Sequence, residues 1–294
     1  MQIEEAPTAM IDRVTSLLET FVGQRPLTLA EIARRAHLPR SSTHRILQRL
    51  VELGWVERHG FKYALGIRMF ELGSQVVRQR SVHEAAVPVM TELNRRTGLT
   101  AHLSILAGSE ILHLERVGLW PNNGRGWTIG ARQPVELSAA GHALLASMDT
   151  EAWPELEFAS TPTCYSVRTR LQLERELRKV RDRGGVAVDA QGCALGVTVV
   201  AAPIGIDVDR GRVALSLCGP TRGVKTDAVV AMVRSAAVDI WHAASGVPRL
   251  RPRAVPPAYS PPVGPVADHA QLPESTGAVS LVENARVASE RKNR

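Results

Sequence analysis

The sequence has few aromatic residues, few cysteines and no long apolar run, and each shortage excludes a class of protein. Only 4% of its 294 residues are aromatic, so a core must consist mainly of Val, Leu, Ile and Ala. The three cysteines are scattered and form no C-x-x-C pair, which argues against a disulfide framework and against a zinc or redox motif. No apolar run reaches the roughly 18 residues needed to cross a membrane, and the acidic N-terminus does not resemble a signal peptide. We therefore expect a cytoplasmic protein with no membrane contact.

Sequence motifs of common enzymes are also missing. There is no G-x-S-x-G nucleophile elbow, no P-loop and no dinucleotide-binding glycine fingerprint. The nine histidines leave a metal-dependent enzyme as one alternative, because His102 and His113 could face each other across a hairpin and be joined by His83 or His142. No carboxylate–histidine spacing in the chain matches a known metal motif, however. We therefore expect no catalytic residues, no metal and no cofactor.

Length, composition and charge indicate two folded parts and a polyanionic partner. A chain of 294 residues with 44% hydrophobic and 22% charged residues is long enough for two domains, each with its own core. The net charge is +7 and is unevenly distributed, since residues 25–62 contain eight basic and three acidic residues. This concentration of positive charge favours nucleic-acid binding by the N-terminal part of the chain.

The N-terminal part follows the element order of a winged helix-turn-helix. Apolar residues recur at three- and four-residue steps over 10–21, which predicts a helix. The T-x-x-E spacing of Thr28–Glu31 is that of a capping box at the start of a second helix. Pro39 is placed as the first residue of a third helix, which Gly54 ends. Strand-forming residues on both sides of a glycine turn over 55–65 then predict a hairpin, the wing.

The third helix is predicted to read DNA. Its apolar residues lie on one side and its polar and basic residues on the other, which fits a helix in the major groove, where Arg pairs with guanine. Basic residues in the wing are placed to bind phosphates or the adjacent minor groove. The DNA-binding residues that we predict are Arg40, Ser41, Ser42, His44, Arg45, Gln48 and Arg49 in the helix and Arg58, His59 and Lys62 in the wing. The expected partner is double-stranded operator DNA.

The rest of the chain predicts a linker helix and a domain of mixed helices and strands. Residues 67–81 have helical periodicity, and over 100–117 the period changes to two around a Gly-Ser turn, which predicts a hairpin. Further strands are expected at 186–189, 197–202 and 212–217, and further helices at 82–97, 139–148, 170–183 and 225–244. Helices packed on an antiparallel sheet are typical of an α+β sensor domain.

Several stretches of the sequence resemble the IclR family of transcription regulators. In the N-terminal part they are PLTLAEIA at 26–33, LPRSSTHRIL at 38–47, LVELGWVE at 50–57 and YALG at 63–66. In the C-terminal part they are residues 196–203, which end in Ala-Ala-Pro, and the Gly219-Pro220 pair after a predicted strand. The resemblance covers residues 10–246 and leaves the end of the chain uncovered.

The resemblance implies the fold and the function. Family members are dimers or tetramers that bind short palindromic operators, and their GAF-like C-terminal domain binds small organic acids, aromatics or other catabolic metabolites. We therefore expect a repressor or activator whose operator binding responds to a small-molecule effector. We expect it to be a dimer or a dimer of dimers, with contacts through Phe70 and Leu72 of the linker helix. The predicted domains are a winged helix-turn-helix at 8–66, a linker helix at 67–81, a GAF-like effector domain at 82–246 and a Pro-rich disordered tail at 247–294.

The resemblance also implies an effector site, formed by amides at the start of one helix and by side chains of the sheet. Amides at a helix start, with the helix dipole behind them, favour a carboxylate. The effector-binding residues implied are Gln133, Ala139, Ala140, Asp189, Val197, Val199, Ser216 and Cys218.

Five positions of this site depart from the family pattern. Val199 and Cys218 stand where Cys and Ser are common, which makes the pocket floor less polar, and Gln133 adds a polar group where Leu is common. Glu136 and His142 replace His and Lys. We therefore expect a somewhat larger, partly apolar ligand instead of a small oxoacid. The alternative is an architectural or protein-binding winged helix without a ligand, which the size of the C-terminal domain disfavours.

Overall fold

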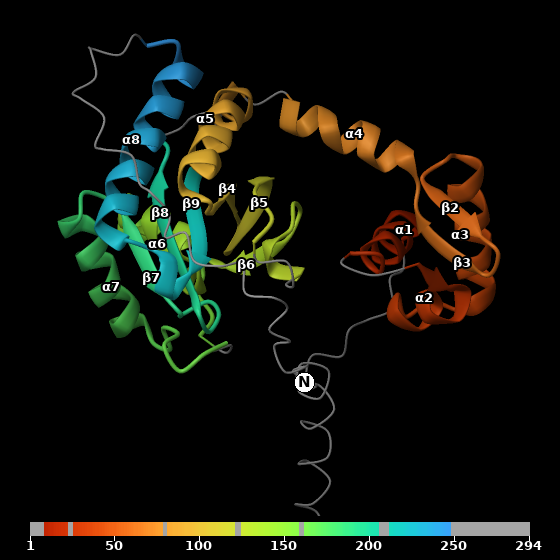
Figure 1. Ribbon diagram of the computed structural model, residues 1–294. Helices are drawn as coiled ribbons and strands as arrows, with labels where there is room; N and C mark the ends of the chain where they lie inside the picture. Colours follow the sequence, from red (N-terminus) through yellow and green to blue (C-terminus); the bar gives the residue numbers. More distant parts are fainter. Residues whose placement is uncertain are drawn as a thin grey trace, which may run out of the picture. The chain divides into compact units, whose positions relative to one another are not determined.

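A computed structural model describes residues 9–22, 26–78, 81–120, 125–158, 162–205 and 212–247. Within these ranges, a three-helix unit with a small sheet is followed by one helix and then by a six-stranded sheet with its own helices (Figure 1). The predicted disordered tail lies outside the described residues, except for Val247.

The N-terminal elements follow the order predicted for a winged helix-turn-helix. They are α1 (Met10–Glu19), β1 (Leu27–Thr28), α2 (Leu29–Arg35), α3 (Arg40–Glu52), β2 (Val56–His59) and β3 (Lys62–Leu65). The strand β1, which the sequence did not predict, pairs with β3, so the wing is a three-stranded sheet in the order β1-β3-β2.

Local interactions define the ends of these helices. The Thr28 hydroxyl accepts a hydrogen bond from the Glu31 amide, and the Glu31 carboxylate accepts one from the Thr28 amide at 2.7 Å, so the predicted capping box is confirmed. Gly54, with a φ of 75°, follows the end of α3 as predicted. The prediction that Pro39 is the first helical residue was wrong. It is the N-cap, in extended conformation, and its carbonyl accepts the first helical hydrogen bond from Thr43.

The core of this unit explains why one side of α3 stays free. Leu17 of α1, Ile32 of α2 and Leu47 of α3 are fully buried and pack with Val56 and Tyr63 of the wing. Because α3 buries the side that carries Leu47, its polar side faces away from the core, as the amphipathic pattern predicted.

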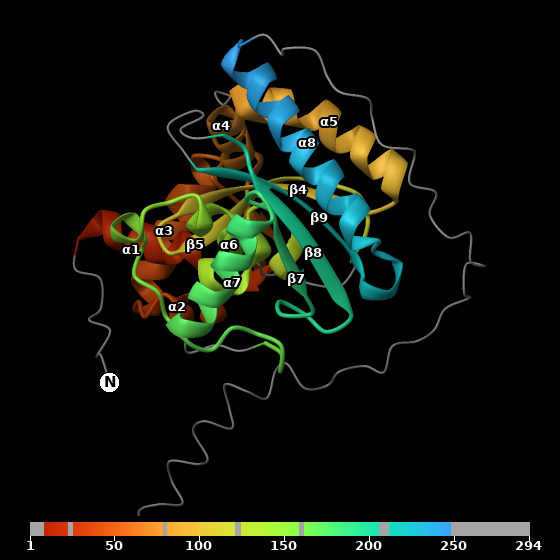
Figure 2. The same cartoon turned by 90° about the vertical axis from the view of Figure 1, so that its left-hand side faces the viewer.

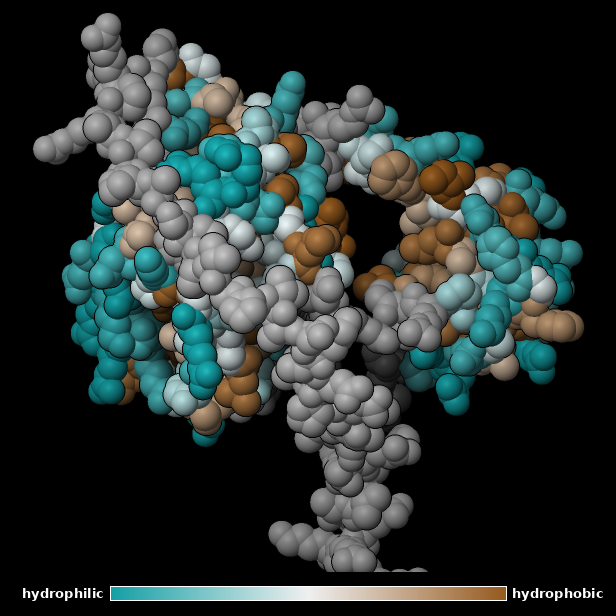
Figure 3. Space-filling model, viewed as in Figure 1, coloured by the Kyte–Doolittle hydropathy of each residue, from teal (hydrophilic) through white to brown (hydrophobic). Residues whose placement is uncertain are grey.

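Helix α4 (Ile67–Arg78) corresponds to the predicted linker helix, and its apolar side chains are exposed. Ile67, Phe70, Leu72 and Val76 are between 50% and 71% exposed. Figure 3 shows hydrophobic residues at the surface along this helix. Exposure of several large apolar side chains on one helix is uncommon in a monomer and typical of an interaction surface.

The C-terminal part contains a six-stranded antiparallel sheet in the order β6-β5-β4-β9-β8-β7. The strands are β4 (Thr100–Ala107), β5 (Glu110–Val117), β6 (Arg132–Pro134), β7 (Ala187–Ala190), β8 (Val197–Pro203) and β9 (Val213–Pro220). The helices are α5 (Ser81–Thr97), α6 (Ala139–Ala146), α7 (Arg170–Asp182) and α8 (Thr226–Ser245). The strands and helices predicted for this part are all present, and β6 is an addition.

Helices cover both faces of the sheet (Figures 1 and 2). Helices α5 and α8 pack on one face, here called the outer face, with a core that includes Leu103 and Leu215. Helix α6 packs on the other face, here called the inner face, and α7 packs against α6 and β7. Hydrophilic residues gather over α7, on the left in Figure 3, as expected for a helix with one solvent-exposed side.

A bulge in β5 changes which residues face each side. Leu103 lies opposite Glu115 and Ser104 lies opposite His113, so Leu114 has no partner in β4. One unpaired residue reverses the alternation of side chains along a strand. As a result His113 lies on the inner face, whereas Glu115 lies on the outer face, where α5 packs.

Candidate DNA-binding and effector sites

The predicted DNA-binding residues of α3 form its exposed face. Arg40, Ser41, His44, Arg45, Gln48 and Arg49 are all exposed. Ser42 is half-buried, at the border with the buried side. Arg49 forms an ion pair with Glu52 at 2.8 Å, which offsets part of the Arg49 charge. The helix therefore presents three cations and several hydrogen-bonding groups on one face, the arrangement that major-groove reading requires.

The predicted wing residues are exposed, but two of them have partners within the wing. The Arg58 Nε donates a hydrogen bond to the Gly60 carbonyl at 2.9 Å, and its guanidinium lies 5.8 Å from the centre of the Tyr63 ring. His59 lies 3.3 Å from the carboxylate of Glu57. The Lys62 side chain forms no hydrogen bond, ion pair or ring contact among the described residues. The wing therefore offers one extended cation, and Arg58 is folded back along the hairpin.

An apolar groove of about 580 Å³ lies beside the recognition helix. Its lining residues are Met10, Val14 and Leu18 of α1, Arg45, Ile46, Arg49 and Leu50 of α3, and Leu53 and Trp55 after it. With the exposed side chains of α4, this groove adds to the uncovered apolar surface of the N-terminal part.

The strand register brings the predicted sheet residues of the effector site together on the inner face. Cys218 of β9 lies opposite Val199 of β8, which in turn lies opposite Asp189 of β7. Ser216 and Val197 lie two residues along their strands from this row and so share its face. Ser216, Cys218, Val197 and Val199 are each at most 7% exposed. These side chains are therefore buried between the sheet and α6.

The start of α6 lies over this face as the resemblance implied. Ala139 and Ala140 are buried in the same core as Val199 and Cys218. The Ser138 hydroxyl caps the helix by accepting a hydrogen bond from the Gly141 amide at 3.0 Å. The amides of Ala139 and Ala140, at the first two positions, have no acceptor within the helix. Gln133 of β6 lies opposite Ile111, an inner-face core residue, and donates to the Gly126 carbonyl at 3.0 Å.

Asp189 is engaged differently from the implied role. Its two carboxylate oxygens accept hydrogen bonds from the amides of Gly192 at 2.7 Å and Cys193 at 2.9 Å, so the carboxylate orders its own turn. Asp189 also lines an open cleft of about 400 Å³, whose polar lining residues include Glu136, His142, Gln172 and Glu176. Burial raises the pKa of Glu136, which is 2% exposed. A free anion would be disfavoured in this cleft, because its charged lining residues are carboxylates.

A buried aromatic and imidazole cluster completes the inner face. His102 lies opposite Ser216, and the His102 and His113 ring centres are 5.0 Å apart, so the predicted meeting of the two histidines is confirmed. The Trp127 ring, from the segment between β5 and β6, lies 6.5 Å from His113 at an interplanar angle of 14°. His102 and Ser104 are fully buried, and His113 is 3% exposed.

Hydrogen bonds fix the state of His102. The Trp127 carbonyl lies 3.2 Å from Nε2 and can only accept, so Nε2 carries the proton. Burial lowers the pKa of His102 to about 3, so the ring is neutral and Nδ1 is an acceptor, 3.9 Å from the Cys218 sulfur, whose thiol can also donate to the Trp120 carbonyl at 4.0 Å. Burial also raises the pKa of that thiol to about 12.

His113 is only partly satisfied. Its Nδ1 is 2.8 Å from the Ser104 hydroxyl, but its Nε2 is buried and forms no hydrogen bond within the described residues. Burial lowers the pKa of His113 to about 4, and the nearby Gly126 carbonyl offsets part of this effect without reaching hydrogen-bond geometry. A buried nitrogen without a partner costs stability unless another molecule supplies one. His113 therefore offers a vacant hydrogen-bonding position on the inner face.

The alternative of a metal site gains no third ligand. His83 lies on the outer face, bonded to Glu115 at 2.9 Å, and His142 Nε2 bonds the Glu136 carbonyl at 2.7 Å, so neither joins the His102–His113 pair. Within the described ranges, no group of three or more His, Cys, Asp or Glu side chains is arranged to hold a metal ion.

Three inner-face residues were missed from the sequence. Ser104 and Trp127 carry no motif, and Trp127 reaches the site through a turn that sequence spacing cannot place. Arg116 lies opposite His102, and its charge lowers the pKa values of both His102 and the Cys218 thiol. It therefore brings positive charge to an otherwise uncharged cluster.

A winged helix with a cationic reading face, joined to a sheet domain with buried polar side chains on its inner face, is the architecture of a ligand-responsive transcriptional regulator. Family models agree in both parts. Residues 10–60 match the IclR helix-turn-helix domain, and residues 74–242 match the bacterial transcriptional regulator IclR C-terminal domain. The chain belongs to the IclR family, and the predicted fold class and function are confirmed.

Relatives of known function or structure support this assignment. The chain is 31% identical over 213 residues to the HTH-type transcriptional regulator XynR of Escherichia coli, covering 70% of this chain and 84% of that protein. It is 29% identical over 231 residues to the transcriptional repressor IclR of the same organism, covering 75% and 84%. The crystal structure of an IclR homolog from Microbacterium hydrocarbonoxydans, complexed with 4-hydroxybenzoate, has a TM-score of 0.69 and 30% identity, covering 81% of this chain and all of that one.

These relatives are transcriptional regulators, not enzymes. In the part of the chain that the structure describes, no helix is both long and apolar enough to cross a membrane.

Proposed function

We propose that this protein senses an aromatic hydroxy acid on the inner face of its sheet and that the ligand changes its affinity for operator DNA. The observation that carries the proposal is the buried cluster of Trp127, His102 and His113, in which one imidazole nitrogen lacks a partner. An aromatic-lined site with one unused hydrogen-bonding position suits a planar ligand with a hydroxyl group. The 4-hydroxybenzoate complex of a relative that is 30% identical supports this ligand class.

Each part of such a ligand has a partner of suitable chemistry. The carboxylate would be held by the amides of Ala139 and Ala140, at the positive end of α6, and attracted by Arg116. The hydroxyl would bond His113 Nε2, and Ser216 would supply a second polar contact. Val197, Val199, Cys218 and Gln133 would line the ring. Asp189 would act indirectly, by holding the turn after β7.

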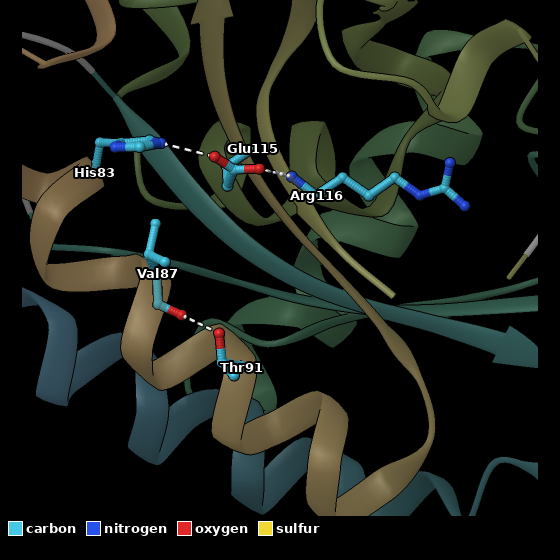
Figure 4. Close-up of polar contacts among 5 residues, drawn as sticks. All are labelled: His83, Val87, Thr91, Glu115 and Arg116. Atoms are coloured by element: carbon cyan, nitrogen blue, oxygen red, sulfur yellow. Dashed lines mark hydrogen bonds and ion pairs between the residues drawn. The ribbon is translucent and has the colours of Figure 1, made fainter. Parts of the chain in front are cut away.

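The proposed path from the ligand to the DNA-binding domain begins at β5. On one side of its bulge, His113 and Arg116 face the ligand, and on the other side Glu115 bonds His83 of α5 at 2.9 Å. Figure 4 shows His83 reaching Glu115 from α5, while the Arg116 side chain runs in the opposite direction. Since α5 begins three residues after α4 ends, movement of β5 would be passed to the linker helix. Only a ligand that binds the two arrangements with different affinity can change DNA binding.

We also propose that the active species is a dimer or a dimer of dimers. The exposed apolar residues of α4 form a surface that a second copy would cover. Two copies would present two α3 helices to the half-sites of a palindrome. Phe70→Glu should lower the mass measured by analytical ultracentrifugation, whereas Leu171→Glu, at an exposed apolar position on α7, should not. An unchanged mass for Phe70→Glu would contradict an interface at α4.

DNA binding is tested with fluorescently labelled DNA from the upstream region of the gene, across a salt series and beside a random duplex. Specific binding with a steep salt dependence is expected, and Arg45→Ala should weaken it by about tenfold or more, since one good base contact contributes ~1–3 kcal/mol. Leu171→Ala is the matched control. Equal binding of both duplexes at every salt concentration would contradict sequence-specific reading by α3.

The effector is tested on the same complex with 4-hydroxybenzoate, benzoate, phenol and glyoxylate. We expect 4-hydroxybenzoate to shift operator affinity most and benzoate to act more weakly, because benzoate lacks the hydroxyl that His113 would bind. His113→Phe should abolish the difference between the two acids. A response to glyoxylate alone would contradict an aromatic ligand. Control titrations with His242→Gln, on α8, should match the wild type.

A further inference from the structure

The wing ends in an exposed aromatic side chain. Phe61 is 86% exposed, more than any other large hydrophobic side chain among the described residues. Single exposed apolar residues are common on protein surfaces. This one, however, stands at the tip of the element that a winged helix applies to DNA, between His59 and Lys62.

Backbone geometry places Phe61 at the apex of the hairpin. His59 pairs with Lys62, so the loop contains only Gly60 and Phe61. Gly60 has a φ of 62° and Phe61 does not have a positive φ, which is the pattern of a type II′ turn with glycine first. A hydrogen bond of 2.9 Å from the Arg58 side chain to the Gly60 carbonyl stabilises this turn. The aromatic ring is thus held at the end of a two-residue turn and not on a loose loop.

Charges around the apex favour DNA as the surface that covers it. Lys62 is exposed beside Phe61, and its side chain forms no ion pair or hydrogen bond among the described residues, although its charge helps to lower the pKa of Glu31. Its ammonium group can therefore still reach a phosphate. Arg58, the other cation of the hairpin, lies against Tyr63 and donates to the Gly60 carbonyl, so it is partly engaged within the wing. The wing therefore presents an apolar tip beside one available cation, and it is continuous in sequence with the cationic face of α3.

We propose that Phe61 is a DNA-contacting residue that buries its ring in the minor groove beside the half-site read by α3. Apolar side chains are known to enter the minor groove and to press on base steps, with basic neighbours bonding the phosphates on either side. Such a contact gains free energy by removing apolar surface from water, so it releases no counterions. Phe61 would therefore contribute to affinity and to DNA shape preference, while Lys62 contributes the salt-dependent part.

The test compares Phe61→Ser, Phe61→Leu and Lys62→Ala in the full chain, bound to the operator over a salt series. Phe61→Ser should weaken binding by about tenfold or more with an unchanged salt slope, and Phe61→Leu should fall between Ser and wild type. Lys62→Ala should lower the slope by about one. Leu171→Ser is the matched control, because it also replaces an exposed apolar side chain with serine but lies on α7. It should bind the operator as the wild type does.

Hydroxyl-radical footprinting supplies a readout of position. The wild type should protect a patch of minor-groove sugars flanking the half-site, and Phe61→Ser should lose that patch while keeping the protection due to α3. Wild-type affinity for Phe61→Ser, or loss of affinity with the footprint intact, would overturn the assignment. A change in oligomeric mass caused by Phe61→Ser would also overturn it, because the ring would then serve contact between copies. Since the wild type is measured in the same series, failure of operator binding itself would be seen separately.

Discussion

Acidification should destabilise the C-terminal domain through its two buried imidazoles. Burial lowers the pKa of His102 to about 3 and that of His113 to about 4, from an ordinary value of 6.5. Both rings are neutral in the folded state, whereas in the unfolded chain they take up protons as the pH falls below about 6.5. The two buried neutral histidines therefore make their full contribution to the free energy of unfolding above about pH 6.5. This contribution is lost as the pH falls from there towards the folded pKa values.

The magnitude follows from the difference between folded and unfolded pKa values. At pH 5 an unfolded imidazole is almost fully protonated, while His102 and His113 are still mostly neutral in the folded protein. Proton uptake by the unfolded chain then lowers the free energy of unfolding by about 2 kcal/mol for each histidine relative to pH 8, or about 4 kcal/mol for both. This loss of about 4 kcal/mol is a large fraction of the roughly 5–15 kcal/mol by which domains are typically stable.

Urea unfolding at pH 8 and pH 5 measures this difference. Tryptophan fluorescence is suitable, because four of the five tryptophans, Trp120, Trp127, Trp153 and Trp241, belong to the C-terminal part, and replacing Trp55 with Phe in every variant removes the fifth. The wild type should lose about 4 kcal/mol more than a double variant in which both histidines are replaced by Gln, and each single variant should recover about 2 kcal/mol. Comparing losses on acidification cancels the titration of groups common to all variants.

The control is His242→Gln, since His242 lies half-buried at the end of α8 and away from the cluster. It should retain the full wild-type loss. If His113→Gln and the wild type lost equal stability between pH 8 and pH 5, the conclusion that burial keeps His113 neutral would be refuted.

Three further results are expected. Glu115→Gln should reduce the effector-induced change in operator affinity while leaving ligand affinity within about twofold, whereas Thr91→Val, which affects only a hydrogen bond within α5 (Figure 4), should change neither. Thr28→Ala should lower the thermal stability of the winged helix by about 1 kcal/mol through loss of the capping box, measured by circular dichroism, and an unchanged midpoint would contradict that role. Gly141→Ala should lower soluble yield and ligand binding, because its Cβ would meet the Val135 carbonyl oxygen. Normal yield and binding would show that α6 can shift to make room.

The sequence by itself determined most of the elements and the exposed polar face of α3, though not the short strands β1 and β6. Helix α3 could be placed because its apolar residues recur with helical period and Gly54 ends it, and both are local properties of the chain. The capping box of α2 was readable for the same reason, as it involves residues three apart. The family resemblance then implied a position for the effector site, including Asp189, Ser216 and Cys218.

Tertiary structure decided how those residues are used. The row of Asp189, Val199 and Cys218 depends on strand register between segments that are distant in sequence. Only the folded turn after β7 shows that the Asp189 carboxylate accepts a hydrogen bond from the Gly192 amide. The bulge at Leu114 shifts Glu115 to the side of α5, which a strict two-residue period could not predict. His102 and His113 are ordinary histidines in the sequence. They become neutral, hydrogen-bonding groups only because the sheet, α6 and Trp127 remove them from water, and burial of that kind exists only after the chain has folded.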